Sequence, residues 1–408
     1  MQDGRVNGHC DPRFERVREE FERNFAERGE VGASVAITVE GEPVVDLWGG
    51  VADPATGRAW EADTVGLLFS STKGITATCV NVLIDRGLID VDAPVSKYWP
   101  EFAQAGKQDI PVRVLLSHQA GLPAWDEPLP FRGLYDWDRA VEALAAQTPA
   151  WEPGTAQGYH AISIGFLGGE LVRRVSGRSL GTFLREEVAG PLGADMWIGL
   201  PEEVEPRVAP SAMYDHTKDE RAHFMRMLAA DPGHFRARTF TNEGGWMTTP
   251  GELDSREAHA AELPAANGIS NARGLARMYA PLALDGSVDG VRLVAAESLP
   301  RMRYPRAISA FDLVFGASSS YTLGFSKSWS NQHMEGEGLS VIIGEDAFGT
   351  PGAGGSIGFA DTDALMSFGY TMNRHGPNIG LNVRGQSLVD AAYRCLGFRT
   401  DEPGCWVR

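Results

Sequence analysis

Strand-like segments lie near both ends of this chain and leave a helical middle, which limits the folds that the chain can adopt. An alternating apolar run at 33–39 is followed by a turn at Gly41-Glu42 and a second run at 44–48, which together predict a β-hairpin. Further strands are expected in the last third of the chain, at 321–329, 339–343 and 364–372. We therefore expect the two ends of the chain to form one antiparallel sheet.

Helices are predicted wherever apolar residues recur at three- to four-residue spacing. The expected helices near the chain ends are 11–29, 70–87 and 384–396. Those of the middle are 110–117, 136–147, 156–176, 179–189 and 271–284. Between them, segments 119–133 and 230–268 are rich in glycine and proline and are expected to be loops.

This pattern predicts a mixed α/β (α+β) fold, with an antiparallel sheet from both chain ends flanked by helices and an inserted, mainly helical lobe. We expect residues 1–95 and 285–408 to form the α/β lobe and residues 96–284 the helical lobe. The functional site is expected in the cleft between them. The chain has 408 residues, of which 43% are hydrophobic and 22% charged, so it can bury a large core and is not disordered.

Charge and cysteine usage exclude several classes of function. The formal net charge of −17 repels phosphate, so nucleic-acid binding is not expected. No apolar run approaches the length of about 18 residues that a membrane span needs, and the first residues do not resemble a signal peptide. The four cysteines form no Cys-x-x-Cys pair, so we expect free thiols and a cytoplasmic location, with a Cys395–Cys405 bridge as the alternative.

The clearest chemical pattern is Ser70-Ser71-Thr72-Lys73, which follows an extended stretch and opens a predicted helix. Residues three apart share one face of a helix, so Ser70 and Lys73 are expected to touch. A helix N-terminus favours negative charge and burial lowers the pKa of a lysine, so the pair fits a serine nucleophile with an amine base. Only one of the five lysines follows a serine at this spacing. The alternative is a helix-capping serine beside a surface lysine.

Two further segments carry candidate chemistry. Tyr159, in Gly158-Tyr159-His160-Ala161, enters an apolar helix, and a phenol beside a Ser–Lys pair can shuttle a proton. The alternative is a core tyrosine. The glycine-rich run 349–356 allows a close approach to a ligand and can present N–H donors to an oxyanion. The alternative for this run is a flexible hairpin loop.

Together, Ser-x-x-Lys, a tyrosine about 90 residues later and a glycine-rich strand near the C-terminus resemble the serine β-lactamase/DD-peptidase superfamily. Within it, the chain resembles the class C β-lactamase-like esterases, or family VIII carboxylesterases, over nearly its whole length. The segments that also carry this resemblance are 115–122, 175–180, 190–193 and 270–276.

The resemblance implies a role for each of these groups. Ser70 would be the acylated nucleophile, and Lys73 and Tyr159 would share the general-acid and general-base work. The backbone N–H groups of Ser70 and Ala353 would form the oxyanion hole. The resemblance implies no metal and no organic cofactor.

Two positions depart from the β-lactamase pattern. Ala161 stands where a β-lactamase has the asparagine of Tyr-x-Asn, and Thr350 stands where the third motif often has lysine or histidine. Both changes weaken recognition of a lactam or a peptide carboxylate, so ester hydrolysis is the expected activity. The residues expected to bind substrate are Thr350, Gly352, Gly354, Trp125, His160 and Gln119. For the tryptophan, core packing is the alternative.

Other motifs have a structural interpretation. Ser179 and Ser356 both stand in G-x-S-x-G, but a nucleophile elbow needs a strand before the serine and a helix after it. Ser179 is expected to cap a helix, and Ser356 lies in a strand-rich region with only His375 after it as a base. His118 is expected to bond to the backbone. The nine histidines form no HExxH motif and no tight cluster, so no metal site is expected.

The sequence thus predicts a carboxylesterase whose partner is a small-molecule ester. An acyltransferase, or an amide hydrolase acting on β-lactams or D-amino-acid peptides, would use the same acyl-enzyme and stays open. A non-catalytic binding protein is disfavoured, because a scaffold has no chemical need for Ser70, Lys73 and Tyr159 together. No nucleic-acid or membrane partner is expected, and the sequence is compatible with a homo-oligomer.

Overall fold

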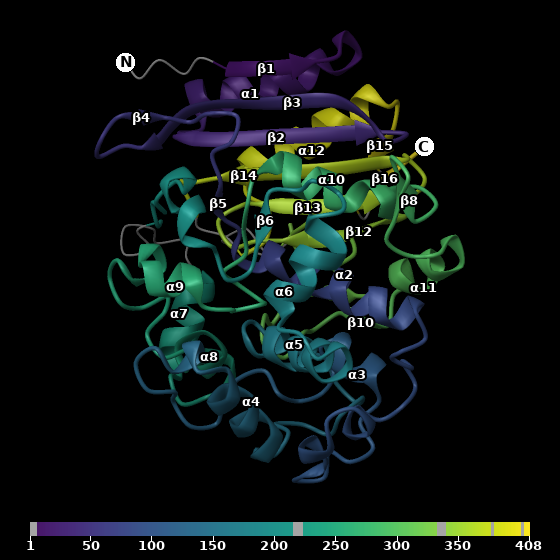
Figure 1. The fold of residues 1–408 in the computed structure, drawn as a ribbon. Helices are drawn as coiled ribbons and strands as arrows, with labels where there is room; N and C mark the ends of the chain where they lie inside the picture. The colour runs from purple at the N-terminus through teal and green to yellow at the C-terminus, as the bar shows by residue number, and fades with distance from the viewer. Residues whose placement is uncertain (1–5, 215–222, 333–339, 377–378, 401–403) are drawn as a thin grey trace.

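The computed structural model of this chain describes residues 6–214, 223–332, 340–376, 379–400 and 404–408. At its centre is a seven-stranded antiparallel sheet in the order β1-β3-β2-β14-β13-β12, with β4 paired to β3 (Figure 1). The strands are β1 Val6–Cys10, β2 Gly32–Val39, β3 Glu42–Asp53, β4 Arg58–Ala59, β12 Ala347–Pro351, β13 Ile357–Asp361 and β14 Met366–Met372. All come from residues 6–59 or 347–372, which confirms the expected fold class.

Helices cover both faces of this sheet. Helices α1 (Glu15–Glu27) and α12 (Val383–Cys395) pack together on one face, against Val35 and Ile37 of β2. Helix α10 (Ala272–Ala283) crosses the other face, where its first turns contact Ala36. Neighbouring residues of a strand point to opposite faces, which explains this division.

Small residues let α10 approach the sheet closely. Gly358 of β13, Gly369 of β14 and Ala36 of β2 are paired across three strands in one row. A Cβ atom on Gly358 would lie 2.6 Å from the Tyr279 ring, and one on Gly369 would lie 2.2 Å from the Ala272 carbonyl oxygen. The row therefore has to consist of small residues where the helix crosses.

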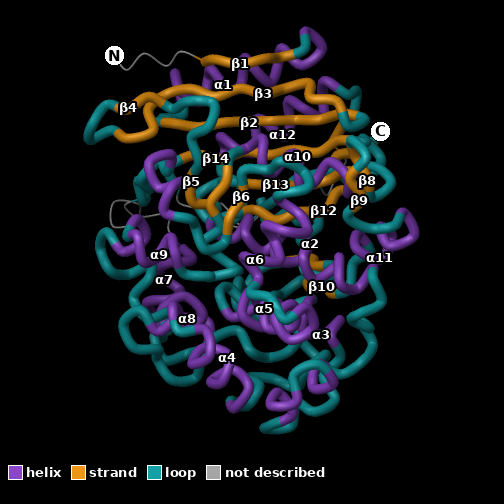
Figure 2. Tube along the Cα trace, in the orientation of Figure 1, coloured by secondary structure: helices purple, strands orange, loops and turns teal. Residues whose placement is uncertain are grey.

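The rest of the chain is mainly helical and lies beside the β12 edge of the sheet (Figure 2). Its helices are α2 Thr72–Asp85, α3 Val112–Leu116, α4 Trp137–Ala146, α5 Ser163–Ser176, α6 Leu180–Leu184, α7 His223–Ala230, α8 Phe235–Thr241, α9 Arg256–Ala260 and α11 Leu299–Arg303. A π-helical segment, Arg185–Ala189, continues α6. The short 3-10 helices are Pro12–Phe14, Phe69–Ser71, Val95–Lys97, Pro100–Ala103, Gly133–Tyr135, Glu202–Arg207, Glu252–Asp254 and Ala296–Ser298.

Short strands complete the described part of the chain. A three-stranded sheet has the order β5-β7-β6. Its strands are β5 Gly66–Leu67, β7 Ile269–Ser270 and β6 Met196–Trp197. The two-stranded pairs are β8 Ser287–Val288 with β9 Val291–Arg292, β10 Ala307–Ser309 with β11 Ser319–Tyr321, and β15 Arg399–Thr400 with β16 Trp406–Val407.

Several expected elements differ from the observed ones. The predicted strand 321–329 is wrong: β11 ends at Tyr321, and Gly324 with a φ of +94° interrupts an extended course. Of the predicted strand 339–343, Leu339 lies outside the described residues, and Val341 forms only an isolated bridge with Trp329. The expected loop 230–268 contains α8 and α9, and the expected helix 156–176 begins only with α5.

None of the four cysteines forms a disulfide, so the alternative of a Cys395–Cys405 bridge is not realised. None of the helices described here combines the length and the apolar character needed to cross a bilayer.

Candidate active site

Ser70 lies in a tight turn between a strand and a helix. Strand β5 leads into the 3-10 helix Phe69–Ser71, and α2 begins at Thr72. Phe69 has a φ of +46°, a left-handed conformation that residues other than glycine rarely adopt. The turn brings Ser70 Oγ within 2.9 Å of Lys73 Nζ, as the spacing in the sequence predicted.

Tyr159 reaches Ser70 from the loop that precedes α5. Its hydroxyl lies 2.8 Å from Ser70 Oγ. The Tyr159 ring stacks on Phe315 with ring centroids 4.5 Å apart. Its backbone N–H donates to Asp312 Oδ1 at 3.0 Å, and the same oxygen accepts the backbone N–H of Val314 and of Phe315. Asp312 therefore fixes the tyrosine, although no sequence motif marks it.

Burial sets the protonation of the two groups beside Ser70. Lys73 is buried, with its Nζ 3.0 Å from the Ala265 carbonyl oxygen and 4.8 Å from the centre of the Tyr159 ring. This burial lowers the pKa of the Lys73 ammonium well below its usual range, which favours the neutral amine. Burial raises the pKa of Tyr159, so the phenol keeps its proton, although its hydrogen bond with Ser70 opposes this shift.

The turn between β12 and β13 completes the arrangement around Ser70. Gly355 N–H donates to the Gly352 carbonyl oxygen at 3.0 Å, which closes the turn around Ala353. The Ala353 N–H itself has no hydrogen-bond partner among the described residues. Ala353 and Ser70 line the same cavity. An oxyanion hole formed by their two N–H groups stays a prediction.

The cavity beside Ser70 has a volume of about 510 Å³. Most of its lining is apolar and comes from α7, α8, the loop before α5, the segments between α8 and β7, and the loop before α12. It includes Ile162, Leu228, Phe240, Met247, Ala266 and Ile379. No lysine, arginine, aspartate or glutamate lines it within the described ranges. The site is therefore suited to a neutral, apolar ligand.

Of the residues predicted to bind substrate, Gly354 lines this cavity, whereas the others lie outside its lining. Thr350 is buried in β12, where its hydroxyl lies beside Gly74 of α2. Gly352 is the first residue of the turn between β12 and β13, and its N–H donates to the Ser356 carbonyl oxygen at 2.7 Å.

Trp125, His160 and Gln119 lie in the packing around α5. Trp125 Nε1 donates to the Ala140 carbonyl oxygen. His160 Nδ1 lies 2.6 Å from the Gly158 carbonyl oxygen, and its Nε2 accepts the Leu122 N–H at 3.0 Å. Burial lowers the pKa of His160 to about 4, so it is neutral. Gln119 Nε2 donates to Ser117 Oγ.

Three motifs with a structural interpretation have backbone partners. Ser179 caps α6 by accepting the Thr182 N–H. His118 Nδ1 accepts the His160 N–H at 3.0 Å. Ser356 Oγ donates to the Leu68 carbonyl oxygen at 2.8 Å. Ser356 is buried and is followed by strand β13 rather than by a helix, so it is not a nucleophile elbow.

His375 lines the cavity, although no sequence motif marks it as a binding residue. Its ring packs edge-on against Phe69 with centroids 4.8 Å apart. Burial lowers the pKa of His375 to about 3, and the charge of Arg384 contributes, so the imidazole is neutral. Because neighbouring segments of the fold bring it to the cavity, no local spacing could have indicated it.

This mixed α/β fold defines a serine hydrolase of the β-lactamase-like type. It brings together the turn that carries Ser70 (the nucleophile turn), a buried lysine, a tyrosine and a glycine-rich edge strand. The Beta-lactamase family model matches residues 18–392, and the chain belongs to this family. The catalytic roles of Ser70, Lys73 and Tyr159 remain predictions, which the geometry makes chemically reasonable.

Several known proteins are similar to the chain over nearly its full length. It is 36% identical over 383 residues to the esterase/beta-lactamase LipL of Mycobacterium tuberculosis, which covers 91% of this chain and 83% of LipL. A solved family VIII carboxylesterase is 41% identical, with a TM-score of 0.84 over 96% of this chain and 100% of that one. A penicillin-binding protein homolog from Caulobacter crescentus is 36% identical, with a TM-score of 0.81 and the same coverage.

Proposed function

We propose that this protein hydrolyses carboxylic esters through an acyl-enzyme on Ser70. The observation that carries this proposal is the apolar cavity beside Ser70, which contains no charged side chain among its described lining residues. β-Lactams and peptide substrates carry a carboxylate that needs a cationic partner when it is bound. A neutral ester needs none. The similarity of this chain to a family VIII carboxylesterase supports ester hydrolysis as well.

The geometry supports a specific division of labour. Neutral Lys73 takes the proton of the Ser70 hydroxyl, and Oγ attacks the ester carbonyl carbon. The N–H groups of Ser70 and Ala353 hold the resulting oxyanion. When the carbon–oxygen bond to the alcohol breaks, the Tyr159 hydroxyl protonates the leaving alkoxide, and the Lys73 ammonium returns that proton to Tyr159. Water then attacks the acyl group with the same residues in reverse roles.

The size of the cavity favours esters with a medium-sized apolar acyl or alcohol group. Its volume of about 510 Å³ lies within the range of small-molecule sites. The partner in this proposal is therefore a neutral, small-molecule ester, and no nucleic-acid or membrane partner is invoked. None of the four cysteines forms a disulfide, which supports a reducing, cytoplasmic location as part of the same proposal.

β-Lactam hydrolysis is the activity to set against this proposal, because LipL is described as an esterase/beta-lactamase. The test compares kcat/KM for a series of p-nitrophenyl esters with kcat/KM for a chromogenic cephalosporin. We expect the best ester to exceed the cephalosporin by at least about 100-fold, since the lactam carboxylate would be bound without a cationic partner. A cephalosporin that is turned over faster than every ester would contradict the proposal.

A further inference from the structure

We infer that Ser356 is a positioning residue. It holds the two N–H groups of the proposed oxyanion hole, those of Ser70 and Ala353, at a fixed distance from each other. This inference rests on the proposed acyl-enzyme on Ser70, because only that reaction gives the hole a function. Ser356 does not line the cavity, so its role is to act through Ser70 and Ala353.

The hydroxyl of Ser356 joins the glycine-rich turn to the nucleophile turn. It is 1% exposed, and its Oγ donates to the Leu68 carbonyl oxygen at 2.8 Å. Ser71 Oγ lies 3.0 Å from Ser356 Oγ. Because the proton of Ser356 is engaged with Leu68, the Ser71 hydroxyl is the donor of this second bond. Leu68 and Ser71 lie on either side of Ser70.

The backbone of Ser356 fixes the segment that carries Ala353. Its carbonyl oxygen accepts the Gly352 N–H at 2.7 Å, immediately before Ala353 in the chain. Across the described residues, both hydrogen bonds that join segment 68–71 to segment 352–356 involve Ser356 Oγ. One side chain therefore links the two backbone segments whose N–H groups are proposed to hold the oxyanion.

The close contact between these segments depends on Gly352. A Cβ atom at this position would lie 2.2 Å from the Leu68 carbonyl oxygen and 2.2 Å from Ser356 Oγ. No side chain fits there without breaking the contact between the turns. Gly352, predicted from the sequence to bind substrate, therefore belongs to the contact between the turns.

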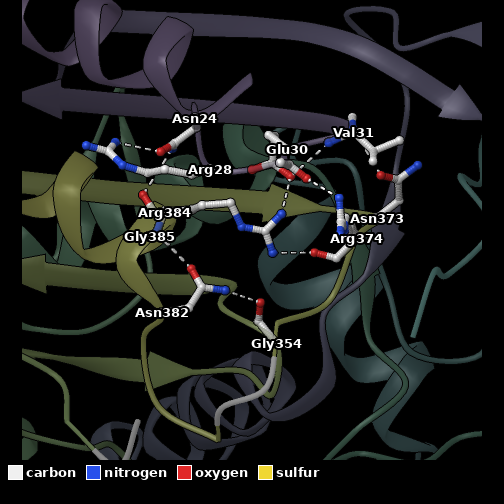
Figure 3. Close-up of polar contacts among 12 residues, drawn as sticks. Asn24, Arg28, Glu30, Val31, Gly354, Asn373, Arg374, Asn382, Arg384 and Gly385 are labelled. Carbon is white, nitrogen blue, oxygen red and sulfur yellow. Dashed lines mark hydrogen bonds and ion pairs between the residues drawn. The ribbon is translucent and has the colours of Figure 1, made fainter. Parts of the chain in front are cut away.

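The other end of the turn is held separately. Asn382 Nδ2 donates to the Gly354 carbonyl oxygen at 2.6 Å, while its Oδ1 caps α12 by accepting the Arg384 and Gly385 N–H groups (Figure 3). The Gly376 N–H donates to the same Gly354 oxygen at 3.0 Å. Since these contacts do not involve Ser70, loss of the Ser356 hydroxyl is expected to move the turns relative to each other rather than unfold them.

The test uses the Ser356→Ala variant and a pair of substrates that differ only in the carbonyl atom. An oxoester and the matching thionoester undergo the same attack by the serine. The sulfur of the thionoester is larger and accepts only weak hydrogen bonds, so a correctly spaced oxyanion hole stabilises its transition state little. The ratio of kcat/KM for the two esters therefore reports the geometry of the hole. Ser71→Ala removes the second hydroxyl of the same contact and is measured in parallel.

A matched control is available in the same sheet. Thr38 Oγ1 and Ser367 Oγ form a buried hydroxyl pair at 2.7 Å, between β2 and β14 and away from the cavity. Ser367→Ala thus removes a comparable hydrogen bond without touching either turn. Thermal unfolding of all variants shows how much stability each substitution costs.

We expect Ser356→Ala to lower kcat for the oxoester about 10- to 100-fold, with a change in KM of less than about threefold and a matching fall in the oxoester-to-thionoester ratio. Ser367→Ala should lose comparable stability and keep that ratio.

A Ser356→Ala enzyme with an unchanged ratio, or an equal change in Ser367→Ala, would overturn the positioning role. If Ser356→Ala does not fold, an unchanged ratio in Ser71→Ala overturns it and a lowered ratio supports it. A wild-type protein that turns over no ester would overturn the proposed function as well, so the two failures can be told apart.

Discussion

The Tyr159 hydroxyl lies 2.8 Å from Ser70 Oγ although the two residues are 89 positions apart in the chain. Two separate local structures create this contact. The strained turn at Phe69 presents Ser70, and buried Asp312 holds the backbone of Tyr159. Lys73 Nζ and the Tyr159 hydroxyl therefore both contact Ser70 Oγ. The expected acid–base chemistry depends on this arrangement.

Removal of either partner of Ser70 should slow the chemical step. We expect Lys73→Met and Tyr159→Phe each to lower kcat for a short ester by about 10²- to 10⁴-fold, the usual contribution of a general acid or base. Lys97→Met, at an exposed lysine, is the control and should keep wild-type activity. Steady-state kinetics on purified variants provide the measurement. Near-normal kcat in Lys73→Met would exclude the lysine as the base.

The pH dependence of hydrolysis should have a rising limb far below the usual lysine value of 10.5. The reaction needs the neutral amine of Lys73, and its fraction grows as the pH rises through the lowered pKa of this group. Because burial raises the pKa of Tyr159, the phenol keeps its proton and no alkaline decline is expected up to about pH 10. The measurement is kcat/KM against pH, corrected for spontaneous hydrolysis. A rising limb centred near 10.5 would show that Lys73 is not desolvated.

The buried ion pair between Glu30 and Arg384 should be important for stability (Figure 3). Their charged groups are 2.8 Å apart, and Tyr370 also donates to Glu30. We expect Arg384→Met to cost about 3–5 kcal/mol, because it leaves the buried carboxyl group of Glu30 without its cation. Arg23→Met, at an exposed arginine paired with Glu20 and Glu27, is the control and should leave the free energy of unfolding nearly unchanged. Denaturant unfolding provides both values.

The loss in Arg384→Met should also depend on pH. Burial already raises the pKa of Glu30, and the charge of Arg384 opposes this rise. Without the arginine, the folded state holds a proton that the unfolded state releases, so stability falls as the pH increases above the pKa of the unfolded carboxyl. Unfolding curves at several pH values test the sign. A deficit that shrinks as the pH rises would contradict it.

The contact between α10 and the sheet should not tolerate a side chain at Gly369. A Cβ atom there would lie 2.2 Å from the Ala272 carbonyl oxygen, so Gly369→Ala has to push the helix away. We expect a loss of about 1–3 kcal/mol, typical of an overpacked core. Gly233→Ala is the control, since the nearest atom to its Cβ would be 3.8 Å away, and it should change stability by less than about 0.5 kcal/mol. Equal melting temperatures for the two variants would contradict this explanation of the glycine row.

Local patterns were sufficient to predict the features that depend on neighbouring residues. The hairpin of β2 and β3 follows from alternation and a glycine turn, and the contact between Ser70 and Lys73 follows from helical spacing. The mixed α/β fold with a sheet from both chain ends was also predictable, because strands at the ends need partners.

Features that depend on packing between distant segments could not be predicted from local patterns. Strands β12 and β13 are absent from the strands that alternation predicts, because glycine has a low strand propensity, and only the family resemblance implied a glycine-rich strand near the C-terminus. Here Gly349 and Gly358 are needed for close approach to Phe359 and to α10. The roles of Asp312 and His375 arise from contacts with Tyr159 and Phe69 far away in the chain. No spacing rule relates residues that only the tertiary fold brings together.

Whether Ser70 is the nucleophile is tested by intact-mass spectrometry of the wild-type protein and of Ser70→Ala during hydrolysis of a short p-nitrophenyl ester. We expect the wild type to release p-nitrophenol and to gain the mass of one acyl group on Ser70, and Ser70→Ala to do neither while keeping the wild-type melting temperature. Turnover that persists in Ser70→Ala, or an acyl group attached at another residue, would contradict the assignment of Ser70 as the nucleophile.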